Sequence, residues 1–432
     1  MSKLEIQWPD EAAERVRAAQ GRLERAGVAL RARSLANRIG AVARVLEDWT
    51  RADSPWRREL VESFSATSPF SRGTVAEGLE SALRAWDPAQ LVAAAERELA
   101  CGLPGPDGGL PARMLAPFSY TAVLAGGTIP MPTLLTSLLP LVLGSPVLLR
   151  ESSKDPVTGR LLARSLAARD TDFARAFEPI ELPTEDGDAL ASLLSAPCVV
   201  ATGGDETMRA IAARLRADQR FVAYGHRVSI AIVGPQATGE LERIAGAIAL
   251  DVARWDQTGC LSPIAVLLVG LGAEARRDVA SAIARALDAL ATTMPRGELP
   301  VATRALHAAE RAEARMRAAS GRAQLFEGRD SLVVLEDDAE LRPAPLHRFL
   351  RLLPVASAEA LRVALDALGA PLSNVALAGF PPEKRREIAA ELARHGASRI
   401  TSPGRLQTPP VDWPRDGLPL FTPLARFASQ DD

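Results

Sequence analysis

The residue best suited to covalent chemistry in this chain is Cys260, which lies in the stretch 255–263, read as WDQTGCLSP. A thiol attacks an electrophile only as the thiolate, and helix termini or nearby cations lower its free pKa of roughly 8.5. A Gly-containing turn that exposes backbone N–H groups therefore suits a nucleophilic cysteine. The alternative is a structural cysteine, because free cysteines are commonly buried in the core.

The segments on either side of this turn would hold Cys260 in place. Residues 241–255 carry apolar side chains at helical spacing and charged ones on the opposite face, which predicts an amphipathic helix. Residues 264–269 form a short apolar run with β-branched members, which favours a buried strand, although a buried helix can have the same pattern. We therefore expect Cys260 at a helix-to-strand junction.

A second set of polar residues follows a predicted strand at 147–149. Arg150, Ser152, Ser153 and Lys154 come directly after it. Open α/β sheets bind ligands at the carboxyl ends of their strands, so this position favours a role in binding.

Thr202, Gly203 and Gly204 form a predicted turn between an apolar strand and a helix at 208–215. Free N–H groups and the positive end of a helix would face an anion such as a pyrophosphate there. The pattern is not GxGxxG, and Asp205 acting only as a helix cap explains it equally well.

Gly225 and His226 lie in a turn before a predicted strand at 230–233. A lone histidine in such a turn is more often structural, but its pKa near 6.5 leaves acid–base catalysis open. Cys198 lies inside an apolar strand and is expected in the core, whereas Cys101 lies in a loop region without a partner nearby in sequence.

Composition excludes several classes of function. The 432 residues include 51 Lys and Arg against 53 Asp and Glu, and the net charge of −2 favours neither nucleic acid nor a membrane surface. Three cysteines and four histidines without a C-x-x-C pair indicate neither a disulfide framework nor a metal site. The N-terminus lacks the apolar region of a signal peptide, so we expect a reducing, cytoplasmic setting.

The apolar segment 132–149 is nearly long enough to cross a membrane, but prolines interrupt it. A buried helix at 133–143, a turn and the strand at 147–149 explain it better. Across the whole chain we expect a helical N-terminal region at 1–109, a cofactor-binding domain at 110–231, a catalytic domain at 232–410 and a C-terminal tail at 411–432.

The order of these parts resembles the aldehyde dehydrogenase superfamily. Within it, three stretches are similar to the acyl-CoA reductase family of the bacterial luminescence type, and the likeness covers roughly residues 110–425. These stretches are YGHRVS at 224–229, DQTGCLSP at 256–263, and GASRIT at 396–401 with WPRDG at 413–417.

The resemblance implies an α/β protein with a Rossmann-type cofactor domain, an α/β catalytic domain and a helical N-terminal region. It implies NADPH-dependent reduction of an acyl thioester, either acyl-CoA or a carrier-bound acyl group, to an aldehyde through an acyl group on Cys260. In aldehyde-oxidising relatives a glutamate that activates water stands at the position of Ala223, and its absence favours reduction over hydrolysis.

Two other positions depart from the family's pattern. Thr128 stands where the family has an asparagine whose amide holds the oxyanion, and Arg150 replaces a lysine. The acidic residue that often holds the adenosine ribose corresponds to Ser153, with Lys154 beside it, which favours NADP over NAD. A cofactor- or acyl-binding protein without catalysis, a subunit that needs a partner, and an aldehyde-oxidising enzyme remain alternatives. Acyl chain length and oligomeric state, including a homo-oligomer, stay open.

Overall fold

The computed structural model describes residues 11–100, 114–182 and 186–429, and these residues form two compact units. Unit 1 contains residues up to 60, residues 87–225 and residues from 419 onward, whereas unit 2 contains residues 61–86 and 226–418. The helices expected within 1–109 are therefore divided between both units. The chain passes from unit 1 to unit 2 between Gly225 and His226, near the boundary expected at 231.

Unit 1 is built on a five-stranded parallel sheet with the order β4-β3-β2-β5-β6. Its strands are β2 (Thr121–Leu124), β3 (Val147–Arg150), β4 (Phe177–Ile180), β5 (Cys198–Thr202) and β6 (Arg220–Tyr224). The chain runs outward from β2 to β4 and then returns to the other side of β2 with β5. Open α/β sheets bind ligands at such a reversal, here at the carboxyl ends of β2 and β5.

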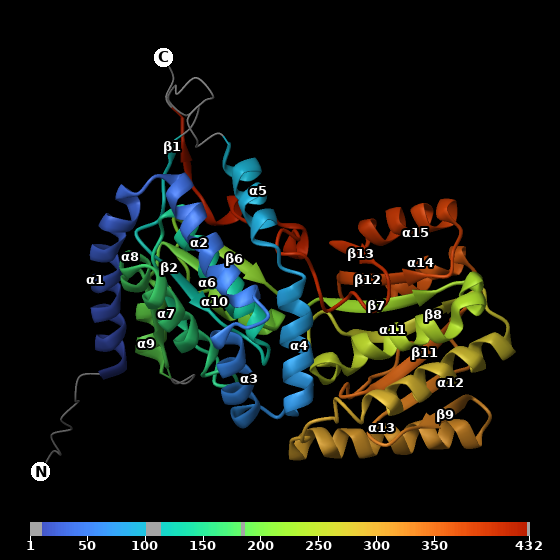
Figure 1. The fold of residues 1–432 in the computed structure, drawn as a ribbon. Coiled ribbons are helices and arrows are strands. Elements are labelled where there is room, and N and C mark those ends of the chain that lie inside the picture. The colour runs from blue at the N-terminus through green and yellow to red at the C-terminus, as the bar shows by residue number, and fades with distance from the viewer. Residues whose placement is uncertain (1–10, 101–113, 183–185, 430–432) are drawn as a thin grey trace, which may run out of the picture. The chain divides into compact units, whose positions relative to one another are not determined.

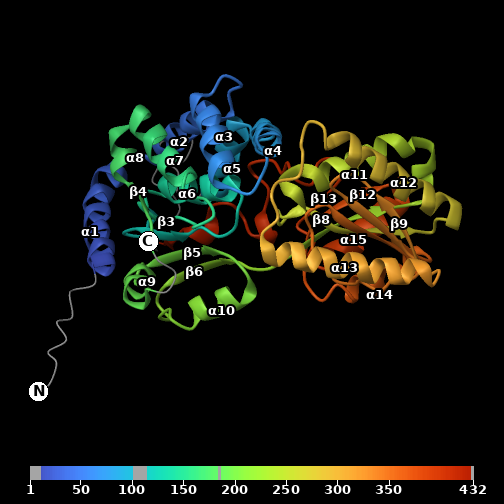
Figure 2. The same ribbon diagram turned by 90° about the horizontal axis from the view of Figure 1, so that it is seen from below.

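Helices cover both faces of this sheet (Figure 2). Alternate strand residues such as Ala122 and Val199 pack with α1, α9 and α10, while α6 and α7 lie on the opposite face. The helices of unit 1 are α1 (Glu11–Ala32), α2 (Leu35–Thr50), the first part of α3 (Pro55–Thr67), α5 (Pro88–Leu99), α6 (Pro130–Leu143), α7 (Thr158–Arg169), α8 (Thr171–Arg175), α9 (Gly187–Leu194), α10 (Asp205–Ala212) and the short η5 (Thr422–Leu424).

Unit 2 contains a seven-stranded sheet with the order β13-β12-β7-β8-β11-β10-β9, in which only β9 is antiparallel to its neighbour (Figure 1). Its strands are β7 (Val228–Val233), β8 (Pro263–Val269), β9 (Ala323–Glu327), β10 (Leu332–Glu336), β11 (Phe349–Val355), β12 (Leu372–Ala378) and β13 (Arg399–Thr401). Val266 and Leu268 pack with α11 and α12, and Ala265 and Leu267 pack in a separate cluster with α14 and α15. This alternation explains why β8 is apolar at every position.

The helices of unit 2 are the rest of α3, α4 (Arg72–Arg84), α11 (Leu241–Ala253), α12 (Ala273–Leu290), α13 (Val301–Ala319), α14 (Ala358–Asp366), α15 (Pro382–Arg394), η2 (Pro235–Glu240), η3 (Arg254–Gln257) and η4 (Arg415–Gly417). Two glycines let α4 approach this unit closely. A Cβ on Gly73 would lie 2.1 Å from the Thr293 carbonyl oxygen, and one on Gly78 would lie 2.5 Å from the Trp255 indole. This close packing explains why residues 61–86 belong with the later part of the chain.

A predicted strand and a predicted helix differ from the structure in where they begin and end. The run 115–125, predicted as one strand, includes only the last residue of β1 (Met114–Leu115), which pairs with β14 (Phe427–Ala428), and then the separate strand β2. The helix predicted over 208–215 begins three residues earlier at Asp205, so Gly204 and not Asp205 occupies the cap position. Within the described part of the chain, no helix is both long enough and apolar enough to cross a bilayer.

Candidate active site

Cys260 lies in unit 2, in the short connection between η3 and β8, and it is exposed. Its main chain is anchored to the neighbouring strand, because the buried Ser229 of β7 donates a hydrogen bond from Oγ to the Cys260 carbonyl oxygen at 3.0 Å. The backbone is therefore held while the thiol remains accessible. The predicted helix-to-strand junction is confirmed, although the helix ends at Ala253, before Trp255.

The segment just before Cys260 has an unusual backbone conformation. Trp255, Asp256 and Gln257 have φ angles of 53°, 47° and 63°. A residue with a Cβ pays about 1 to 2 kcal/mol to enter this left-handed region. The turn closes with a hydrogen bond from Thr258 N–H to the Trp255 carbonyl oxygen at 2.9 Å. Local preference opposes this turn, so tertiary contacts must stabilise it.

Asp256 makes the principal contacts that hold this turn. Arg348 donates to its Oδ1 from Nε at 2.9 Å and from Nη2 at 2.7 Å, and Gly297 N–H donates to its Oδ2 at 2.9 Å. Asp256 is 2% exposed and Arg348 is fully buried. Removing one partner of such a pair commonly costs about 3 to 5 kcal/mol, because a buried charge is left unpaired. Gln257 adds a hydrogen bond from Nε2 to the Pro263 carbonyl oxygen at 3.0 Å.

Charged residues from the C-terminal WPRDG stretch influence the thiol. The protein around the Cys260 thiol desolvates the thiolate and raises its pKa, although the residue is exposed. The positive charge of Arg415 opposes this rise, and the negative charge of Asp416 adds to it. Burial also raises the pKa of Asp416, whose carboxylate forms an ion pair with Arg227 at 3.2 Å.

Residues 404–406, which precede the WPRDG stretch, are held by Asp251 near the end of α11. Its buried carboxylate accepts hydrogen bonds from Gly404 N–H at 2.6 Å and from Leu406 N–H at 3.1 Å. The next residue, Gln407, donates from Nε2 to Ser262 Oγ, inside the cysteine stretch. Ser262 and Asp251 thus connect the C-terminal segment to both ends of the connection that carries Cys260.

Most of the predicted binding residues meet at one edge of unit 1. A Cβ on Gly126, after β2, would lie only 1.9 Å from the Thr202 carbonyl oxygen at the end of β5, so the two turns touch. Ser152 donates from Oγ to the Gly127 carbonyl oxygen at 3.0 Å. These contacts bring Ser152, Thr202 and Gly203, with the adjoining Thr128, to the carboxyl ends of the strands.

Gly204 and Gly225 lie beside this edge as well. Gly204 is the cap residue of α10, and a Cβ on Gly225 would lie 2.9 Å from Asp205 Oδ1 on the same helix. Thr128 is half-buried in unit 1. Its role toward the oxyanion stays a prediction.

Arg150 lines a largely apolar cavity of about 180 Å³ in unit 1. Burial lowers the pKa of its guanidinium, and its Nη2 donates to the Leu182 carbonyl oxygen at 3.4 Å. Ser153 and Lys154 are exposed, while Glu151 is buried and pairs with Arg160 at 3.2 Å. The cavity is lined by Leu124, Arg150, Leu182, Leu190, Leu194, Thr207, Ala210, Ile211 and Arg214.

His226 is exposed at the start of unit 2. Cys198 is fully buried in β5, where desolvation raises its pKa to about 12, so its expected place in the core is confirmed. Cys101 lies outside the described residues. Among residues 11–100, 114–182 and 186–429, no group of three or more His, Cys, Asp or Glu side chains could hold a metal ion.

Sequence reasoning assigned no role to Ser229, Arg348 or Arg415. Ser229 and Arg415 lie inside family-like stretches, and that context was a usable signal. Arg348 lies in no such stretch and is separated from Asp256 by 92 positions. Local pattern gives no signal for such a pair.

Comparisons with known proteins agree with this architecture. The sequence profile of the family described as acyl-CoA reductase (LuxC) matches residues 115–428. No curated protein matches by sequence. An NAD-dependent benzaldehyde dehydrogenase structure from Corynebacterium glutamicum superposes with a TM-score of 0.70 at 15% identity, covering 97% of this chain and 90% of the other.

An NADP-dependent glyceraldehyde-3-phosphate dehydrogenase from Bacillus halodurans superposes with a TM-score of 0.68 at 12% identity, covering 97% and 91%. At these identities the structures show the fold alone, and the expected aldehyde-dehydrogenase-like α/β fold is confirmed. The family match spans well over half of the chain and supports an aldehyde-related oxidoreductase. The chain belongs to the acyl-CoA reductase (LuxC) family.

Proposed function

We propose that this protein reduces an acyl thioester to an aldehyde, with Cys260 as the nucleophile and NADPH as the reductant. The Cys260 thiolate attacks the thioester carbonyl carbon, the bond to the carrier sulfur breaks, and the carrier leaves as a thiolate that takes up a proton. The acyl group is then held on Cys260 as a new thioester. The nicotinamide, when bound, supplies the hydride that reduces this carbonyl carbon. The C–S bond to Cys260 then breaks, which releases the aldehyde and regenerates the thiolate.

The carboxyl edge of the unit 1 sheet supports binding of a dinucleotide. The touching turns at Gly126 and Thr202 allow close backbone approach, and the cavity beside them combines leucines with Arg150 and Arg214. An apolar pocket with few polar groups suits a base, and arginines suit a phosphate. We assign NADPH over NADH because Arg150 lines the cavity and none of its described lining residues carries a carboxylate.

Ala223 and Thr128 have separate proposed roles in the reaction of the acyl-enzyme. Ala223 on β6 has no carboxylate to activate water, so the acyl-enzyme would persist until it is reduced. Thr128 is proposed to donate a hydrogen bond to the oxyanion in place of an amide. His226 is proposed as the group for proton transfer.

The observation that carries the proposal is the exposed Cys260 on a strained connection whose backbone is fixed by Ser229, Asp256 and Gln257. Intact-mass measurement after addition of acyl-CoA without NADPH should show one acyl group, and peptide mapping should place it on Cys260. Cys260→Ala should remain unmodified and inactive, whereas the matched Cys198→Ala variant should be acylated like the wild type. Full turnover by Cys260→Ala would refute the proposal.

A further inference from the structure

The turn just before Cys260 consists of residues in the left-handed backbone region, none of which is glycine. Among the described residues, those other than glycine with positive φ are Trp255, Asp256, Gln257, Leu346, His347, Arg348 and Asp416. The first three form the turn before Cys260, and Asp416 acts electrostatically on its thiol. Residues held in rarely populated regions cluster at functional sites, where the surrounding structure must enforce them. We therefore expect the turn at 346–348 to have a function as well.

The turn at 346–348 has the same backbone conformation as the turn at 255–257. Its φ angles are 59°, 50° and 67°, and it closes with a hydrogen bond from Phe349 N–H to the Leu346 carbonyl oxygen at 3.0 Å. The two turns are joined through their own side chains, because Arg348 donates twice to Asp256. Neither turn is favoured by its local sequence. Each turn supplies the charged side chain, Asp256 or Arg348, that pairs with the charged side chain of the other turn.

Arg348 also connects this pair to a third segment. Its Nη1 contacts Asp330 Oδ2 at 3.2 Å, and the same carboxylate oxygen accepts from Arg296 N–H at 2.7 Å. Gly297, the residue after Arg296, donates from its N–H to Asp256 Oδ2, so the segment 296–297 contacts both Asp330 and Asp256. All these donors and acceptors belong to unit 2. The carboxylate of Asp256 is thus fixed from two sides, and its position sets the start of the connection that ends at Cys260.

We propose that Arg348 is a positioning residue for the nucleophile: it clasps Asp256 so that the left-handed turn presents the Cys260 thiol in the orientation that acyl transfer requires. This inference rests on the proposed function of Cys260. Arg348 would act through the backbone of residues 255–260, without touching the substrate or the thiol. A displacement of about 1 Å in a reacting group can cost about 10²-fold in rate.

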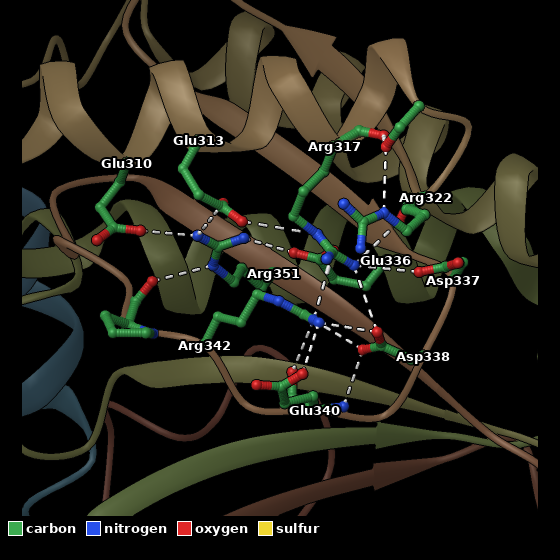
Figure 3. A network of polar contacts seen from close by, with 12 residues as sticks. Glu310, Glu313, Arg317, Arg322, Glu336, Asp337, Asp338, Glu340, Arg342 and Arg351 are labelled. Atoms are coloured by element: carbon green, nitrogen blue, oxygen red, sulfur yellow. Dashed lines mark hydrogen bonds and ion pairs between the residues drawn. The ribbon is translucent and has the colours of Figure 1, made fainter.

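A matched control is Arg351, which lies on β11 three positions after Arg348. Arg351 is also fully buried, and it pairs with Glu310 at 2.9 Å, with Glu313 at 3.3 Å and with Glu336 (Figure 3). Figure 3 shows this network between α13 and the strands, extending to Arg317 and Arg342. None of the residues in that network belongs to the turn before Cys260. Loss of Arg351 therefore disturbs a buried ion-pair network that does not include Asp256.

The test compares Arg348→Lys with Arg351→Lys, because lysine keeps the charge but cannot reproduce the forked contacts of arginine. The rate of Cys260 acylation by acyl-CoA, followed by intact mass, should fall about 10- to 100-fold in Arg348→Lys and stay near wild type in Arg351→Lys. Alkylation of Cys260 by iodoacetamide, which needs little orientation, should change little in either. Amide hydrogen exchange at Thr258 and Ser262 should accelerate only in Arg348→Lys.

Asp256→Asn serves as a milder second variant if Arg348→Lys does not fold. Its amide oxygen still accepts from Arg348, whereas the contact with Gly297 N–H is lost. Slower acylation of Cys260 and faster amide exchange in this variant also support the inference. Equal acylation rates and equal exchange in the two lysine variants would overturn it while leaving the proposed function intact. If wild-type Cys260 is not acylated at all, the proposed function fails, and exchange decides alone. In that case, faster exchange at Thr258 in Arg348→Lys but not in Arg351→Lys supports the positioning role of Arg348. Unchanged exchange in Arg348→Lys rejects that role.

Discussion

Gly78 of α4 lies against the indole ring of Trp255, so close that a Cβ at this position would be 2.5 Å from Cε2. Trp255 is 2% exposed, and the ring of Phe70 meets it edge-on at 5.5 Å. The ion pair between Arg254 and Glu77 at 2.8 Å joins the same two segments. Part of the N-terminal helical region thus packs directly against the turn that precedes Cys260.

We therefore expect Gly78→Ala to destabilise unit 2, because the new methyl group must displace the indole. Overpacking of this kind costs about 1 to 3 kcal/mol in free energy of unfolding. Gly246→Ala in α11 is the matched control, since no atom lies within 4 Å of its Cβ position, and it should stabilise by about 0.5 to 1 kcal/mol. Urea denaturation checks both, and equal stability of the two variants would contradict the described packing.

The charge of Arg415 should set the pH dependence of Cys260 reactivity. Arg415 opposes the raised pKa of the thiol, so Arg415→Gln should raise that pKa further and move the alkylation profile to higher pH. Asp416→Asn removes a negative charge and should move the profile in the opposite direction. Rates of iodoacetamide labelling across a pH series measure both shifts. Identical profiles in wild type and Arg415→Gln would exclude this electrostatic role.

Cofactor preference should depend on Arg150. Arg150→Gln should weaken NADPH binding about 10-fold or more and leave NADH nearly unchanged, because a charge-assisted hydrogen bond is worth about 1.5 to 3 kcal/mol. The exposed Ser153 offers the opposite test. Ser153→Glu should repel a 2′-phosphate and shift preference toward NADH. Titration of both cofactors at fixed salt measures the ratios, and tighter NADH binding by the wild type would contradict the assignment.

Thr128 should contribute to turnover through its hydroxyl. If it donates to the oxyanion, Thr128→Val should lower kcat about 10²- to 10³-fold with little change in KM, and Thr128→Asn should preserve or raise activity. Thr136→Val is a suitable control, because that hydroxyl donates to the Pro132 carbonyl oxygen within α6 at 2.7 Å. Steady-state kinetics with one acyl-CoA compares the four proteins. No effect at Thr128 would leave the oxyanion to backbone N–H groups near Cys260.

The local sequence determined the elements that flank the candidate site. The apolar runs at 147–149 and 264–269 form β3 and β8, and the segment 133–143 lies within α6, because helical and strand periodicities are local properties. The position of Cys260 in a turn between α11 and β8 could also be read directly. The likeness of that stretch to a family pointed to acyl-CoA reductases, and the family assignment was confirmed.

Only the tertiary structure decided how that turn is held. Nothing in the types of Trp255, Asp256 and Gln257 predicts left-handed φ, because the local preference of each residue opposes it. The partner that stabilises the turn, Arg348, lies 92 positions away in a turn of the same kind. Likewise, two glycines allow α4 to join unit 2, although its sequence reads as part of a separate helical region. Such contacts depend on which distant segments the whole fold brings together, and a pattern confined to neighbouring residues carries no record of them.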